Sequence, residues 1–126
     1  MDRGEAVPHF TLTDRDGVRT SYASSIWQQK QLVLVLLGSE RSSEADDYAA
    51  RLHRAFADAD GDTALIVTNE SLAELSGPAA LVADRWGEIV HVARAARPNA
   101  LPPPEDLAAW AEHVRQRCPE CEGESR

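Results

Sequence analysis

Cysteine is scarce in this 126-residue chain, and long apolar runs are absent. The two cysteines, Cys118 and Cys121, are too few for the disulfide framework of a small secreted domain. The longest fully apolar run covers only residues 32–37, whereas a membrane span needs about 18 residues. The first five residues also lack the basic and apolar regions of a signal peptide. We therefore expect a cytoplasmic protein with no membrane partner.

Basic residues are also few. The chain has 13 of them against 21 acidic residues, which gives a net charge of −8. Nucleic-acid binding needs clustered lysine and arginine, so we expect no nucleic-acid partner. The hydrophobic share of 43% is enough for a packed core, and the length fits one domain. We predict one domain over residues 1–117, followed by a polar tail over residues 118–126.

The hydrophobic pattern alternates between strand-like and helix-like segments. The run over residues 32–68 is typical of a strand, a helix and a second strand, which predicts parallel pairing of the two strands. In chain order we expect a hairpin over residues 10–20, a helical turn or loop over 22–27, a strand over 32–37, a helix over 39–58, a strand over 63–68, one or two helical turns over 70–75, a hairpin over 79–93, an extended connector over 98–104 and a helix over 105–117. This order indicates an α/β fold with a central mixed sheet flanked by helices and an N-terminal β-hairpin.

Several polar and aromatic residues allow two interpretations. Ser43 and Asp46 have the spacing of a helix capping box, and we favour this structural role for residues 39–43 over anion binding helped by Arg41. Trp86 lies in a predicted turn, where we favour packing over the hairpin above an exposed anchor for a partner. The four histidines lie on different elements, so we interpret them as structural or surface residues: His9, His53, His91 and His113.

Motifs for other chemistry are absent from the sequence. There is no Gly-x-Ser-x-Gly elbow and no glycine-rich phosphate loop. The acidic residues Glu44, Asp46 and Asp47 are interpreted as a solvated helix face, because neighbouring helix positions point apart. The sequence therefore gives no support for hydrolysis or for nucleotide binding.

Short motifs along the chain resemble those of one family. Residues 4–12 are Gly-Glu-Ala-Val-Pro-His-Phe-Thr-Leu, and residues 14–20 add an Asp-x-x-Gly hairpin. A second Asp-x-x-Gly-x-Ile turn covers residues 84–89, and Gly77-Pro78 precedes a predicted strand. In this order the motifs resemble those of the redoxin family, which includes the peroxiredoxins. The resemblance covers residues 4–117 and implies a thioredoxin-like fold with a cis-proline at Pro78.

The chain departs from that family at its active-site loop. In redoxins, the loop after the first buried strand supplies a reactive cysteine at a helix N-terminus. Here the loop is Gly38-Ser39-Glu40-Arg41-Ser42-Ser43-Glu44, with Arg41 and Glu44 at the two cysteine positions of a thioredoxin-type register. Ser42 and Ser43 do not replace a thiol, because a hydroxyl lacks its pKa and its redox chemistry. The family's usual active site is therefore absent.

The segment Cys118-Pro119-Glu120-Cys121 carries the only thiols of the chain. It follows the last predicted helix, whose negative C-terminal end disfavours a thiolate, so we expect an ordinary or raised pKa for these thiols. Three interpretations remain open: a dithiol that exchanges with a partner, a zinc half-site, and an inert tail. Two chains would supply the four thiolates of a zinc site across a homodimer, with His113 as a further candidate ligand.

The leading hypothesis is a redoxin-like thiol–disulfide protein whose dithiol, Cys118 and Cys121, has moved to the tail. One cysteine would attack the disulfide of a protein partner and the other would resolve the mixed disulfide. If the chain is an enzyme, it is then a thiol–disulfide oxidoreductase. The alternative is a non-catalytic binding or dimerisation module with a thioredoxin fold, with no cofactor other than zinc in its tail.

Overall fold

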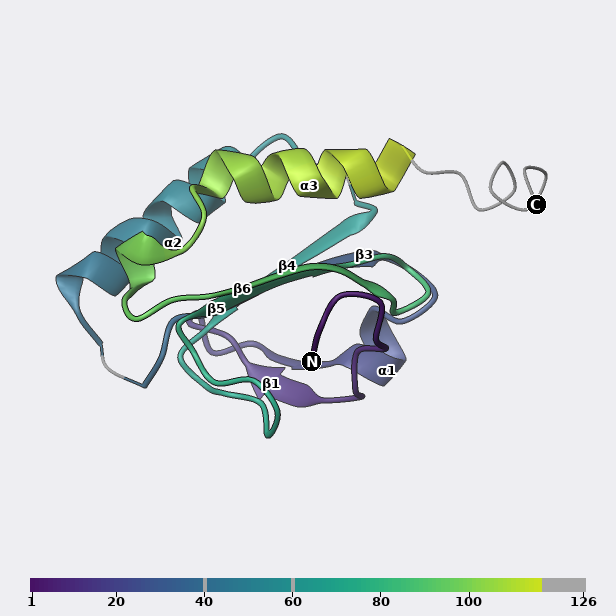
Figure 1. The fold of residues 1–126 in the computed structure, drawn as a ribbon, viewed down its shortest axis with the longest axis horizontal. Coiled ribbons are helices and arrows are strands. Elements are labelled where there is room, and N and C mark those ends of the chain that lie inside the picture. The colour runs from purple at the N-terminus through teal and green to yellow at the C-terminus, as the bar shows by residue number, and fades with distance from the viewer. Residues whose placement is uncertain (40, 60, 117–126) are drawn as a thin grey trace.

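The chain folds around a four-stranded sheet in a computed structural model that describes residues 1–39, 41–59 and 61–116 (Figure 1). Most predicted elements are present at or near their expected positions. In chain order the elements are β1 (Thr11–Thr13), β2 (Arg19–Ser21), α1 (Tyr22–Ser25), β3 (Gln31–Leu36), α2 (Ser43–Ala55), β4 (Thr63–Thr68), β5 (Ala79–Ala83), β6 (Ile89–Arg94), the 3-10 turn η1 (Pro98–Ala100) and α3 (Pro104–Gln116).

The main sheet is mixed, as the sequence predicts. Its strand order is β4-β3-β5-β6, and β1 pairs with β2 in a separate hairpin. Strand β3 runs parallel to β4, from Gln31 opposite Thr63 to Leu36 opposite Thr68. The pairs β3–β5 and β5–β6 are antiparallel. The strand–helix–strand unit predicted over residues 32–68 is thereby confirmed.

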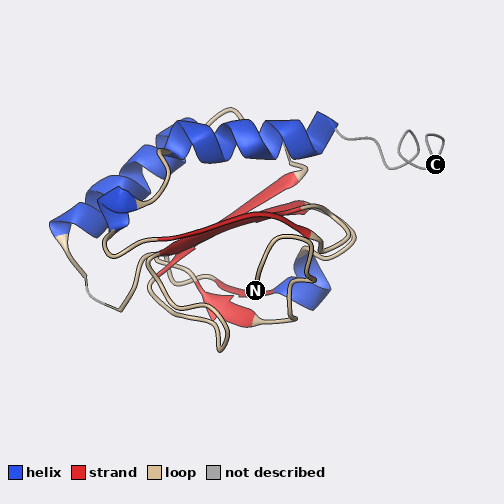
Figure 2. Cartoon of the chain, in the orientation of Figure 1, coloured by secondary structure: helices blue, strands red, loops and turns tan. Residues whose placement is uncertain are grey.

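Strand β3 explains why the domain has layers on both sides of the sheet. All six of its residues are buried, and side chains alternate between the two faces of a strand. Val33 and Val35 pack in the core under α2 and α3. Leu32, Leu34 and Leu36 pack on the opposite face, in a core with Leu12 of β1 and Tyr22 of α1. Figure 2 shows both long helices on one face and the hairpin with α1 on the other.

Two hairpin turns with the same sequence pattern have the same geometry. Asp14 accepts hydrogen bonds from the backbone N–H groups of Asp16 and Val18, each at 2.9 Å. Asp84 accepts them from Trp86 and Glu88, again at 2.9 Å. The fourth residue of each turn is a glycine with a φ of 86°, a conformation that costs glycine little.

Some helical predictions were wrong in their bounds. Helix α2 begins at Ser43 and ends at Ala55, and its N-cap is Ser42, whose Oγ accepts from the Ala45 N–H at 3.1 Å. The capping box predicted at Ser43 is therefore replaced by a cap one residue earlier. The residues between β4 and β5 contain no helix, because Leu72 and Leu75 exchange backbone hydrogen bonds in a tight loop instead. The connector predicted to be extended contains the turn η1.

Trp86 corrects a further prediction. It is 52% exposed, so the turn leaves about half of this residue open to solvent, where the sequence favoured packing. Among the described residues, none of the helices combines the length and the apolar character needed to cross a membrane.

The central strand gives a direct test of the fold. Leu34→Ala leaves a cavity in a fully buried site, so we expect it to lower the free energy of unfolding by about 2–5 kcal/mol. Val18→Ala is the matched control, because Val18 is 56% exposed and its truncation should change the value by less than about 0.5 kcal/mol. Urea unfolding measures both, and equal effects would contradict the central position of β3.

Candidate functional site

Three segments meet at the carboxyl ends of β3 and β4. They are the loop that leads from Gly38 to α2, Asn69 after β4, and the cis peptide bond Gly77–Pro78 before β5. Gly77 touches the end of β3 so closely that a Cβ atom on it would lie 2.6 Å from the Leu36 carbonyl oxygen and from the Gly38 nitrogen. This is the place where the redoxin resemblance puts the active site.

A chain of polar contacts holds the loop after β3. The Asn69 side-chain amide donates to the Gly38 carbonyl at 2.8 Å. Arg15, from the turn between β1 and β2, donates from Nη1 to Asn69 Oδ1 at 3.2 Å. The same guanidinium forms an ion pair with Asp46 in the first turn of α2. Because the Arg15 side chain is only 16% exposed, this polar chain ties the loop, α2 and the hairpin together.

Glu44, in the first turn of α2, is held by the segment around η1. Its Oε2 accepts from Arg97 Nε at 3.0 Å and from the Asn99 N–H at 2.8 Å, in the segment around η1. The hydrogen bond from Arg97 is the main cause that lowers the pKa of the Glu44 carboxyl group below its usual value. Glu44, at one of the two cysteine positions of the thioredoxin-type register, thus holds the segment between β6 and α3 in place.

The other loop residues have different surroundings. Ser42 caps α2 with its side chain, whereas Ser43 and Arg41 are exposed. Within the described chain, Arg41 makes no hydrogen bond or ion pair. The residues that the sequence singled out here are therefore brought together as a loop, but they form no arrangement of nucleophile and base.

Cys118 and Cys121 lie outside the described residues, as does the predicted domain boundary. The described chain ends at Gln116 of α3. Gln31, at the start of β3, donates from Nε2 to the Ala111 carbonyl of α3 at 2.7 Å. The end of α3 therefore lies at the amino end of β3, and Figure 1 shows it at the opposite end of the molecule from the start of α2.

The histidines do not gather into a metal site. The His91 ring stacks on Trp110, with centroids 4.8 Å apart, and the His113 ring meets the edge of Trp110 at 6.0 Å. Burial is the main cause that lowers the pKa of His91. Across the described ranges, no group of three or more His, Cys, Asp or Glu side chains could hold a metal ion. The zinc interpretation, with Cys118, Cys121 and the candidate ligand His113, involves residues outside the described ranges and stays a prediction.

Sequence reasoning missed Arg15, Asn69 and Arg97. Arg15 contacts partners 54 and 31 residues away along the chain, and Arg97 contacts Glu44 over 53 residues. No local pattern indicates such pairs. The one available signal is the repeated Asp-Arg-x-Gly turn, which marks Arg15 without naming its partners.

Comparisons with solved structures identify the fold. A proposed protein disulfide isomerase from Bacteroides thetaiotaomicron superposes with a TM-score of 0.61 at 18% identity, over 92% of this chain and 91% of that one. A thiol:disulfide interchange protein of the thioredoxin family from Chlorobium tepidum gives 0.58 at 13% identity, over 88% and 98%. A SCO1/SenC family lipoprotein from Bacillus anthracis gives 0.50 at 10% identity, over 90% and 96%. The chain has a thioredoxin-like fold.

Sequence comparisons add no family to this fold. No family model matches the chain, and no curated protein matches it. The resemblance to peroxiredoxins in particular remains a prediction from the motifs.

The contact between Gly77 and β3 can be tested by adding a methyl group. Gly77→Ala forces a Cβ into backbone atoms at 2.6 Å, so we expect a loss of about 1–3 kcal/mol or more in unfolding free energy. Gly61→Ala is the control, because a Cβ there meets nothing within 4 Å and should be neutral or slightly stabilising. A loss as large for Gly61→Ala would contradict the close approach of the two segments.

The Glu44 carboxylate should stabilise the fold in a pH-dependent way. Its pKa is lowered in the folded state, so its contribution is present above the pKa of the unfolded chain and is lost as pH falls through the folded-state pKa. We expect Glu44→Gln to be less stable than the parent near pH 7, and the difference to shrink as pH falls through the lowered pKa of the Glu44 carboxyl group. Urea unfolding over a descending pH series measures this difference, and a difference that does not change with pH would contradict an ionic role for Glu44.

Proposed function

We propose that this protein is a thiol–disulfide exchange protein in which Cys118 and Cys121 carry the chemistry and the thioredoxin-like domain serves as scaffold. The observation that carries this proposal is the loop between β3 and α2. Its described residues contain no thiol, and Glu44 is occupied by Arg97 and Asn99. Cys118 and Cys121 are the only thiols of the chain. The activities named for the first two structural neighbours are of this class.

The exchange reaction needs only the two cysteines and a partner disulfide. The thiolate of one cysteine attacks a sulfur of that disulfide, and a mixed disulfide forms while one partner sulfur leaves as a thiolate. The other cysteine then attacks the mixed disulfide and releases the second partner thiol. The pair Cys118–Cys121 is oxidised by two electrons and the partner is reduced by two. A small thiol reductant restores the dithiol.

The position of α3 favours a partner that approaches the end of α3 rather than the Arg41 loop. Cys118 follows Gln116 by two residues, which span at most about 7 Å. The six residues of β3 alone separate the two ends of the sheet by about 17 Å. Exchange at Cys118 in a cytoplasmic setting would therefore take place away from Pro78 and the Arg41 loop.

The hydrogen-bonded loop favours a second candidate function. The contacts of Gly38 with Asn69, and of Asp46 with Arg15, belong to a fixed structural element and suit a non-catalytic binding or dimerisation module. In that case Cys118 and Cys121 of two chains would hold one zinc ion in a Cys₄ site. Metal analysis of the purified dimer would then give about half an equivalent of zinc per chain.

Steady-state reduction of insulin disulfides by dithiothreitol tests the first proposal. We expect the protein to accelerate this reduction, and Cys118→Ser and Cys121→Ser each to abolish the acceleration, because exchange with release needs both thiols. Arg41→Ala is the matched control and should leave the rate unchanged, since Arg41 lies at the other end of the sheet.

Two outcomes would end the exchange proposal. The first is a parent protein that gives no acceleration, and the second is a serine variant that keeps the parent's rate. If Arg41→Ala instead lost the acceleration of insulin reduction, the reaction would be assigned to the loop before α2. Zinc in the parent that is lost from both serine variants, with no acceleration in any of them, would support the second candidate.

A further inference from the structure

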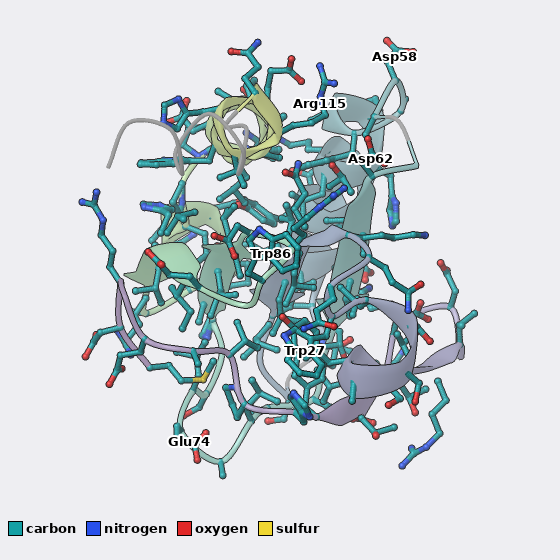
Figure 3. The ribbon with its side chains drawn as sticks, turned by 90° about the vertical axis from the view of Figure 1, so that its right-hand side faces the viewer. Trp27, Asp58, Asp62, Glu74, Trp86 and Arg115 are labelled. Atoms are coloured by element: carbon teal, nitrogen blue, oxygen red, sulfur yellow. The ribbon has the colours of Figure 1, made fainter. Side chains whose placement is uncertain are left out.

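The amino end of β3 carries a group of aromatic side chains that the proposed chemistry does not use. Trp86 lies in the turn between β5 and β6 and is 52% exposed. Trp27, after α1, is half-buried, and its Nε1 donates to the Trp86 carbonyl at 3.4 Å. The exposed ring of His9 lies 4.8 Å from the Trp27 ring. We call His9, Trp27 and Trp86 the aromatic end face; Figure 3 shows the two tryptophans on one end of the molecule.

The turn that carries Trp86 does not itself need a tryptophan. The turn of Asp14 and Gly17 has the same hydrogen bonds and the same glycine conformation, with an exposed Asp16 at the position of Trp86. Aspartate thus satisfies this backbone equally well at the other end of the molecule. A tryptophan side chain that stays half exposed adds little hydrophobic stabilisation to the folded monomer. Tryptophan is, however, among the residues most enriched in binding hot spots.

The backbone behind this face is held in an unfavourable conformation. Gln28 is the only non-glycine residue with positive φ among those the structure describes, at 66°. Its N–H donates to the Arg85 carbonyl at 2.7 Å. This bond joins the segment of Trp27 to the turn of Trp86. Strain of this kind persists where surrounding contacts enforce it, and it is concentrated at binding and functional sites.

The same end of the molecule is where the described chain stops. Arg115 of α3 lies on it with Asp58 and Asp62, as Figure 3 shows, and residues 117–126 follow. Those ten residues contain no large apolar side chain, so they are not suited to cover Trp86. The net charge of −8 disfavours nucleic acid as the occupant.

Charge around Trp86 fits a second copy of this chain. Arg85 and Glu88 flank the tryptophan in one turn, and both are exposed. In an interface with twofold symmetry the same patch occurs on both sides, so an arginine of one copy can face a glutamate of the other. A single turn thereby supplies an apolar anchor and a self-complementary charged rim.

We propose that the aromatic end face is the surface through which two copies of this chain associate about a twofold axis. Helix α3 ends at the same end of the molecule as this face, so in such a dimer both helix ends would lie at the end of each copy that meets its partner. The association goes beyond the exchange reaction and requires neither thiol chemistry nor zinc. Where the second candidate function holds, a Cys₄ site is incomplete without the second copy.

Salt dependence separates an interface held mainly by Trp86 from one held mainly by Arg85–Glu88 pairs, which added salt would weaken. Two chains of charge −8 repel each other, and added salt screens that repulsion. The dimer held by Trp86 should therefore become tighter as sodium chloride rises from about 50 mM to about 500 mM, because the Debye length falls well below 10 Å over that range.

Analytical ultracentrifugation of the full chain tests the proposal, in EDTA and a reductant so that neither metal nor disulfide contributes. We expect a concentration-dependent dimer for the parent, and a dissociation constant at least about tenfold weaker for Trp86→Ala. Val18→Ala is the matched control, because Val18 is similarly exposed at 56% but lies in the turn at the other end of the molecule. Circular dichroism verifies that both variants are folded.

Three results would overturn the proposal. They are a parent that stays monomeric at about 500 µM in high salt, a dimer that Trp86→Ala leaves unchanged, and a dimer that Val18→Ala weakens equally. A failure of the exchange proposal is recognised separately. It would appear as a lack of activity in the insulin assay and would not change the masses that ultracentrifugation measures. A monomeric protein that reduces insulin would in turn remove the interface and leave the exchange chemistry in place.

Discussion

The rest of the fold depends on a strand that is buried on both faces. Strand β3 has no exposed residue, so neither face of the sheet can be left to water without a large loss of hydrophobic stabilisation. Leu32, Leu34 and Leu36 require the hairpin and α1 on one side, and Val33 and Val35 require α2 and α3 on the other. With β3 fixed in this way, loops from both layers meet at its two ends.

At the carboxyl end of β3, electrostatics argue against sulfur chemistry. A reactive thiol at a helix N-terminus depends on the partial positive charge of the first turn to stabilise its thiolate. In α2 that turn already contains two carboxylates, Glu44 and Asp46, and each is paired with an arginine from another segment. A thiolate there would lie beside two carboxylates. The described residues at this end of β3 contain no thiol, and the two ion pairs give them a structural role.

The parts of the fold that could be predicted are those governed by local pattern. The run over 63–68 matches β4 because its apolar residues have no competing helical period. The start of α2 was missed because Ser42 and Ser43 are chemically alike, and only the extended backbone of Ser42 makes it the cap. The helical turns expected after β4 gave way to a loop in which the Thr68 hydroxyl donates to the Thr13 carbonyl and accepts from the Glu70 N–H. Such contacts between distant segments leave no trace in a single sequence.

The Asp14 turn and the Asp84 turn have the same backbone geometry but lie at opposite ends of β3, and their side chains differ in exposure. At the carboxyl end, the Asp14 turn carries Arg15, which contacts Asn69 and Asp46. At the amino end, the Asp84 turn leaves Arg85 outside and presents Trp86 to solvent. Helix α3 also ends at this amino end, where Gln31 donates to the Ala111 carbonyl. The polar contacts and the exposed tryptophan therefore lie at opposite ends of the same strand, and the self-association that we propose would use the end opposite to the Arg41 loop.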